Sequence, residues 1–142
     1  MADSGSASDN RILEQLSWLV TLVSFHQDMF DYIIKLDLLK FIIKISDSKF
    51  PSSIRSNAVL AISLLTYNEN LFDEIIDKGV IELIMALCRD PNQDLTVKQF
   101  STLALVHFAL NKKSINILID KGVLELFDTF GQDNAEDINV VI

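Results

Sequence analysis

The side chains that most often perform chemistry in proteins are few in this sequence and stand far apart. There are two histidines, His26 and His107, and one cysteine, Cys88. Cys88 lies in an apolar run of helical pattern, which predicts a buried and unreactive thiol. The two histidines are separated by more than half of the chain, so the pattern assembles no pair of nucleophile and base. We therefore expect a protein that is not an enzyme.

Two short stretches carry potential metal ligands at close spacing. His26 and the two aspartates that follow it could begin a metal site, but no further ligand is near them in the sequence. The segment 90–101, DPNQDLTVKQFS, has oxygen-bearing side chains at alternate positions but lacks the central glycine and the final glutamate of a calcium-binding loop. We expect this segment to cap a helix through Asp94 or Thr96, and we expect no metal or cofactor.

The composition favours a helical globular domain with a protein partner. Of the 142 residues, 49% are hydrophobic and 23% are charged, and only four glycines and two prolines are present to form turns. The formal net charge of −8 argues against nucleic acid, since phosphate binding needs clustered lysine and arginine. The same charge steers the chain towards a basic partner.

The compartment is inferred from what the chain lacks. A single cysteine cannot form an internal disulfide, which fits a reducing environment. The first residues, MADSGSASDN, lack the apolar core of a signal peptide. No apolar stretch reaches the ~18 residues of a membrane span. We expect a cytoplasmic protein, with the nucleus as an alternative.

Nearly the same nine residues occur twice, as IIDKGVIEL at 75–83 and LIDKGVLEL at 118–126, an offset of 43 residues. The match continues on both sides at the same offset. A weaker copy lies earlier: FDYIIKLDLLKFIIKI at 30–45 aligns with FDEIIDKGVIELIMAL at 72–87, an offset of 42 residues. A period near 40 residues with helical patterning predicts stacked helical repeats.

Each repeat divides into two short helices and one long helix. In the middle copy, the apolar residues of 51–68 share one helical face. A short helix over 70–77 ends at Gly79, which supplies a left-handed turn before the next helix at 80–90. In the first copy Asp37 takes the place of this glycine, and aspartate tolerates the left-handed conformation better than most residues.

This triplet resembles the armadillo repeat, which has a glycine between its first and second helices and an Ala/Leu-rich third helix. The residues that carry the resemblance are GVIEL at 79–83, GVLEL at 122–126, and the third-helix segments 61–65 and 104–108. The resemblance implies an all-α fold, a right-handed α-solenoid of three-helix repeats. HEAT repeats are the close alternative.

The resemblance also implies a division of the chain. We expect a flexible tail at 1–9, an armadillo-type domain at 10–130 and a C-terminal tail at 131–142. Within the domain, the expected units are a third helix at 10–25, repeats at 27–67 and 69–110, and a partial repeat at 112–130.

The ends of such a stack are left unsealed, because each repeat packs only on its neighbours. The chain is then part of a longer array, or its ends self-associate or pack on something else. Val140, Val141 and Ile142 either cover the C-terminal end or form a frayed tail.

In armadillo proteins the third helices line a concave groove, where asparagines hold a peptide backbone and tryptophans four positions earlier hold its side chains. The asparagine positions fall at Leu22, Leu64 and His107, and the tryptophan positions at Trp18, Leu60 and Leu103. The asparagine is never matched, and leucine cannot pair with the backbone of an extended peptide, so this departure from the armadillo pattern favours an amphipathic helix or a globular lobe as partner. The predicted contact residues are Trp18, Leu22, Asn57, Leu60, Leu64, Phe100, Leu103 and His107.

Several interpretations stay open at this point. The leucines either form an exposed groove or are covered by neighbouring helices, and Trp18 is either a binding hot spot or a core residue. The first functional hypothesis is a non-catalytic adaptor that binds a partner protein. The second is a structural subunit or fragment of a ciliary, cytoskeletal or vesicle assembly. The third, by analogy of fold alone, is a regulator of a chaperone or a small GTPase.

Overall fold

The computed structural model describes residues 2–133, and over this range the chain is all-helical. The all-α class predicted from the sequence is confirmed for these residues. Three long helices are separated by pairs of short helices. The long helices are α1 (Ala2–Ser24), α4 (Ser52–Leu65) and α7 (Leu95–Ala109). The short helices are α2 (Phe30–Lys35, preceded by the 3-10 turn η1, Gln27–Met29) with α3 (Leu38–Ile45), α5 (Glu69–Asp77) with α6 (Val80–Arg89), and α8 (Lys112–Asp120) with α9 (Val123–Asp133).

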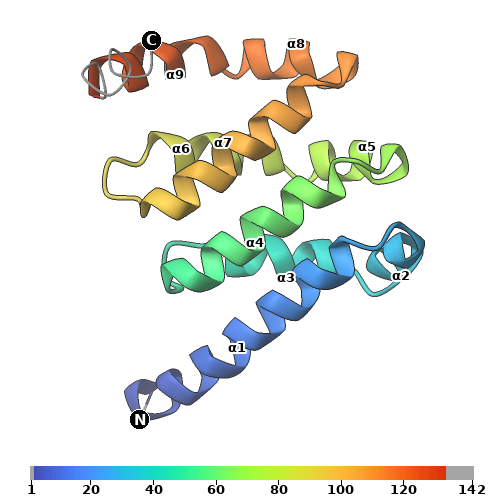
Figure 1. The fold of residues 1–142 in the computed structure, drawn as a ribbon, viewed down its shortest axis with the longest axis vertical. Helices are drawn as coiled ribbons and strands as arrows, with labels where there is room; N and C mark the ends of the chain where they lie inside the picture. The colour runs from blue at the N-terminus through green and yellow to red at the C-terminus, as the bar shows by residue number, and fades with distance from the viewer. Residues whose placement is uncertain (1, 134–142) are drawn as a thin grey trace.

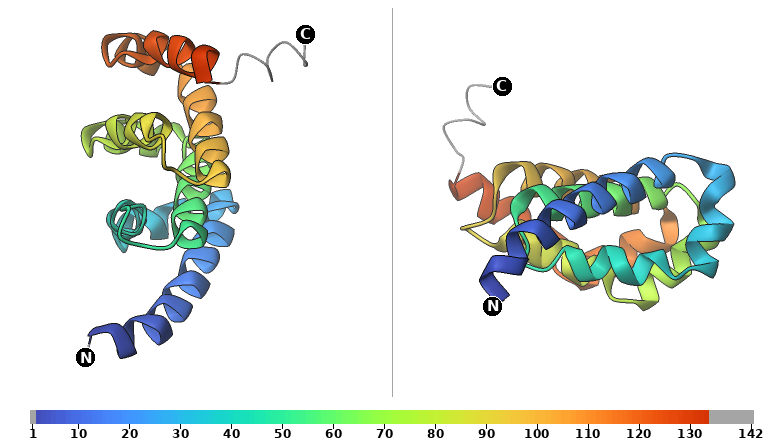
Figure 2. Two further views of the ribbon diagram at one scale, coloured as in Figure 1. Left: turned by 90° about the vertical axis from the view of Figure 1, so that its left-hand side faces the viewer. Right: turned by 90° about the horizontal axis from the view of Figure 1, so that it is seen from below.

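The long helices lie one above another along the longest axis of the molecule (Figure 1). Seen from the side, the long helices line one side of the stack and most of the short helices lie on the other (Figure 2, left). The closest packing is between α1 and α4 and between α4 and α7. We call α2–α4 the first layer, α5–α7 the second layer and α8–α9 the third layer, which has no long helix in the described range.

The turns between paired short helices adopt the left-handed conformation that the sequence predicts. The backbone φ angle is +50° at Asp37, +76° at Gly79 and +92° at Gly122. Glycine enters this region without a steric cost, and aspartate tolerates it better than most residues. At Gly122 a Cβ atom would meet only the ends of flexible side chains, Glu125 Oε2 and Arg89 Nη2, so the positive φ rather than the space favours glycine.

Side chains at the first position before a helix cap the free N–H groups of that helix. Asn68 before α5, Asp94 before α7 and Asn111 before α8 each accept a hydrogen bond from the backbone N–H two residues later, at 2.9, 2.9 and 2.8 Å. The expected capping role of Asp94 is therefore confirmed. Such caps define where each helix begins.

The hydrophobic core lies between the long and the short helices and runs through all layers. Phe72 of α5 and Phe108 of α7 meet edge to face at 5.7 Å, and both are buried. The long helices approach one another through small side chains, which allow close packing. These buried small residues are Ser17, Thr21, Ala58, Ala61, Ser63, Ser101 and Ala104.

The two ends of the domain differ from the predicted bounds. α1 begins at Ala2, so residues 2–9, expected as a tail, continue the helix that was predicted from residue 10. This stretch contains no proline, so the helical hydrogen bonds can extend through it. α9 continues past residue 130 to Asp133, the last described residue. Val140, Val141 and Ile142 lie outside the described residues.

Candidate functional site

The eight predicted contact residues lie on the three long helices. We call the surface that they form the long-helix face. Trp18 and Leu22 of α1 and Leu103 of α7 are exposed, and the Trp18 side chain retains 51% of its accessible surface. The remaining residues, Asn57, Leu60, Leu64, Phe100 and His107, are half-buried. Phe100 packs against the hydrophobic core. Trp18 is therefore not a core residue, whereas the leucines of α4 are partly covered by their neighbours.

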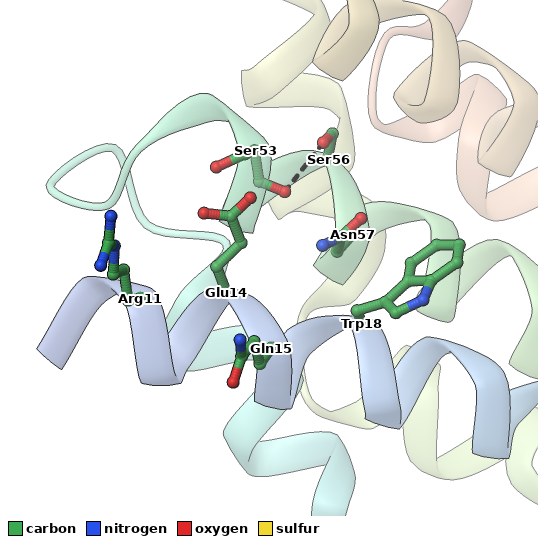
Figure 3. A pocket seen from close by; sticks show the side chains of 7 residues that line it. All are labelled: Arg11, Glu14, Gln15, Trp18, Ser53, Ser56 and Asn57. Atoms are coloured by element: carbon green, nitrogen blue, oxygen red, sulfur yellow. Dashed lines mark hydrogen bonds between the residues drawn. The ribbon is translucent and has the colours of Figure 1, made fainter. Parts of the chain in front are cut away.

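A cavity of about 630 Å³ opens between α1 and the start of α4. Figure 3 shows that Trp18 and Asn57 lie together on one side of it, with Arg11 on the far side. The remaining lining residues are Glu14, Gln15, Ser53 and Ser56. The lining of the cavity thus combines a half-exposed indole with a guanidinium, a carboxylate and two side-chain amides.

The polar lining residues stand at helical spacing from the two predicted ones. Glu14 and Gln15 precede Trp18 by four and three residues, and Ser53 precedes Asn57 by four. These lining residues were not predicted, because the predicted contacts follow the positions that the armadillo pattern marks, with Asn57 and Phe100 one helical turn before them. Helical periodicity around Trp18 was the signal that could have found them.

Asn57 joins α1 to α4. Its Nδ2 donates to Ser17 Oγ at 3.0 Å, and its backbone carbonyl accepts from Thr21 Oγ1 at 2.8 Å. Ser17 and Thr21 are both buried. Both hydroxyl groups also donate to carbonyl groups within α1, so the two contacts with Asn57 add a polar link between α1 and α4. The side chain of Asn57 therefore has a structural role next to the cavity.

His107 joins α4 to α7 in a similar way. Its Nδ1 lies 2.8 Å from Ser63 Oγ, and its Nε2 lies 3.0 Å from the hydroxyl of Tyr67. The rings of Tyr67 and His107 are 4.6 Å apart. Both ring nitrogens thus have partners within the molecule, and His107 contributes mainly its half-exposed edge to the long-helix face.

The remaining reactive side chains do not converge on a second centre. Cys88 is buried, as predicted, and burial raises the pKa of its thiol, which lowers its reactivity at neutral pH. Within residues 2–133, no group of three or more histidine, cysteine, aspartate or glutamate side chains could hold a metal ion. Asp90 and Asp94 accept hydrogen bonds from nearby backbone N–H groups instead.

Comparison with protein-family models, with curated proteins and with solved structures finds no match to this chain. Among the described helices, none is both long and apolar enough to cross a membrane. The function of the chain is therefore inferred from its fold and from the geometry of the long-helix face.

Proposed function

We propose that this chain is a non-catalytic, armadillo-type protein-interaction module, built as a right-handed α-solenoid, that binds a partner protein on the long-helix face. Three features support this assignment: the recurring order of one long and two short helices, the left-handed turns at equivalent positions, and the sequence offsets of 42 and 43 residues. The observation that carries the proposal is the half-exposed Trp18 beside the cavity between α1 and α4. Tryptophan is enriched among the residues that dominate binding energy.

The chemistry of the face favours a partner that presents an amphipathic helix. The polar side chains of Asn57 and His107 already make contacts between the long helices. What remains accessible is apolar, above all Trp18, Leu22 and Leu103. An amphipathic helix satisfies its own backbone hydrogen bonds and presents apolar anchors, whereas an extended peptide would need polar partners here.

The net charge of the chain favours a partner with a basic surface. The chain has a formal net charge of −8, which accelerates association with basic proteins at low ionic strength. Glu14 in the cavity wall offers a carboxylate to a lysine or arginine that flanks the apolar anchors of the partner helix. We therefore expect affinity to fall as salt is added.

The test compares two aromatic residues of similar exposure on different helices. Trp18 on the long helix α1 is 51% exposed, and Tyr32 on the short helix α2 is 54% exposed. A partner is recovered by cross-linking in cells, purified, and titrated against the full-length chain. Trp18→Ala is expected to weaken binding by a factor of about 30, as a hot-spot residue does. Tyr32→Ala should leave affinity unchanged.

Circular dichroism of both variants shows whether helicity is retained. A second variant, Leu64→Asp, places a charge at the centre of the face. If Trp18→Ala and Leu64→Asp bind the purified partner as tightly as the unmodified chain does, the partner uses another surface and the proposal is wrong.

A further inference from the structure

The third layer ends in an uncovered apolar groove. The groove has a volume of about 420 Å³ and lies between α7, α8 and α9. Leu124 and Phe127 of α9 are 57% and 72% exposed, and Val106 of α7 is also exposed. Exposed apolar residues that cluster in this way mark interaction surfaces more often than scattered ones do.

Equivalent positions in the other layers are buried. Phe127 corresponds to Ile42 and Ile84, each of which is fully buried. Leu124 corresponds to Leu39 and Ile81, which are buried as well. In those layers the short helices are covered by the long helix that follows them, since α3 packs on α4 and α6 packs on α7. The groove is therefore the place of a long helix.

The opposite end of the stack has the complementary feature. On α1, Ile12 and Leu19 are 57% and 55% exposed, and Leu16 is exposed between them. The equivalent positions on the two other long helices are fully buried, with no accessible surface. These positions are Ile54, Ala58 and Ala61 on α4, and Val97, Ser101 and Ala104 on α7. On α4 and α7 this stripe lies against the preceding helices, and α1 has no such helices in the described range.

The two ends thus present complementary parts of one layer. Within residues 2–133, the third layer has a pair of short helices without a long helix, and α1 is a long helix without a pair of short helices. We propose that a second copy of the chain docks head to tail, with the Ile12–Leu16–Leu19 stripe of its α1 in the groove between α7, α8 and α9. Within one chain, α4 packs on α1 and on the short-helix pair α2–α3. In the proposed contact, α1 of the second copy takes the place of α4, and it packs on α7 and on the pair α8–α9 of the first copy.

The side chains on both surfaces support this occupant. α1 carries leucines at positions where α4 has Ala58 and Ala61, so its stripe is bulkier than the stripe that fills the equivalent place inside the chain. The groove that receives it is open and holds about 420 Å³. A head-to-tail contact uses two different surfaces, so it does not close with two copies and leads to continued growth.

The experiment blocks each end separately and then mixes the two blocked chains. Leu19→Asp blocks the α1 stripe, and Phe127→Asp blocks the groove. Both residues are more than half exposed, so the monomer is expected to fold. Leu36→Asp, in an exposed turn between α2 and α3, is the control. Light scattering with size-exclusion chromatography gives the mass over a concentration series.

The unmodified chain and Leu36→Asp should show a mass that rises with concentration beyond two chains. Leu19→Asp and Phe127→Asp should each remain monomeric alone, and an equimolar mixture should form a complex of two chains, because each variant retains one intact end. A chain that is monomeric at every concentration overturns the proposal and leaves the groove to a partner's helix or to residues 134–142. The proposal is also wrong if Leu19→Asp or Phe127→Asp alone still forms oligomers, or if the mixture of the two variants stays monomeric.

Discussion

The second and third layers are close copies in sequence, but their apolar residues meet different surroundings. Ile84 on α6 is fully buried, whereas Phe127, at the equivalent position on α9, is mostly exposed. In the second layer α6 packs on the long helix that follows it, α7, whereas no long helix follows α9 in the described range. Whether an apolar side chain is buried at this position therefore depends on the presence of the neighbouring long helix as much as on the residue itself.

This difference predicts the largest effect on stability. Ile84→Ala removes a fully buried side chain and is expected to lower the free energy of unfolding by about 2–5 kcal/mol. Phe127→Ala removes a larger side chain but exposes little new surface, and we expect a loss within about 0.5 kcal/mol for the isolated monomer. Urea unfolding at low protein concentration measures both values.

The variants Ile84→Ala and Phe127→Ala also test whether Phe127 is uncovered in the monomer. If Phe127→Ala costs as much as Ile84→Ala at a concentration where the chain is monomeric, then the third layer is covered within one chain. A cost that appears only at high protein concentration would instead report the contact between copies.

The order of helices could be predicted because its signals are local. A left-handed turn at Gly79 or Gly122, and a helix with regularly spaced apolar residues beside it, depend only on residues that are close in the sequence. The extension of α1 to Ala2 was not predicted, because the sequence signals there are weak and only the absence of proline permits the helix.

The candidate site could be predicted only in part. Trp18 was identified from its place in the armadillo pattern, and its exposure is now established. The contacts of Asn57 and His107 with neighbouring helices were not predicted, since they depend on how long helices cross. That crossing is set by small residues on three helices, which no single stretch of sequence reveals.

The starts of the first and second layers differ in one capping residue, which allows a test of intermediate size. Asn68 caps α5 with its side chain, whereas His26, at the equivalent position before η1, makes no side-chain cap. Their backbone angles are nearly the same, with φ of −96° and −97°. Asn68→Ala is expected to lower the free energy of unfolding by about 1 kcal/mol. His26→Asn should raise it by about 0.5–1 kcal/mol by supplying the missing cap.

The thermal midpoint and urea unfolding measure both changes. His26→Ala is the control, because it removes the imidazole without adding a cap, and we expect a change of only a few tenths of a kcal/mol. If His26→Asn and His26→Ala have equal stability, the 3-10 turn that follows His26 does not accept a cap, and the first layer starts differently from the second.

The smallest predicted effect concerns the ion pair that joins the second and third layers. Lys121 Nζ lies 2.9 Å from Glu82 Oε1, and the hydrogen bond from Lys121 holds the pKa of Glu82 below its ordinary value of 4.5. A carboxyl whose pKa is lowered on folding stabilises the fold above its unfolded pKa, and this contribution is lost as the pH falls through the folded pKa. Both side chains are about half exposed, so the pair contributes no more than about 1 kcal/mol at neutral pH.

Glu82→Gln should therefore reduce stability slightly at pH 7 and not at all at a pH well below 4.5, where the unmodified residue is protonated as well. The control is Asp73→Asn, whose ion pair with Lys113 spans 3.9 Å and is 74% exposed on both sides, so its removal should change stability less. Both ion pairs link the second and third layers, so the difference between the two variants, measured by urea unfolding at both pH values, reports what the shorter and less exposed pair adds. A Glu82→Gln chain that is equally stable at pH 7 would show that this ion pair adds no measurable stability to the contact between the second and third layers.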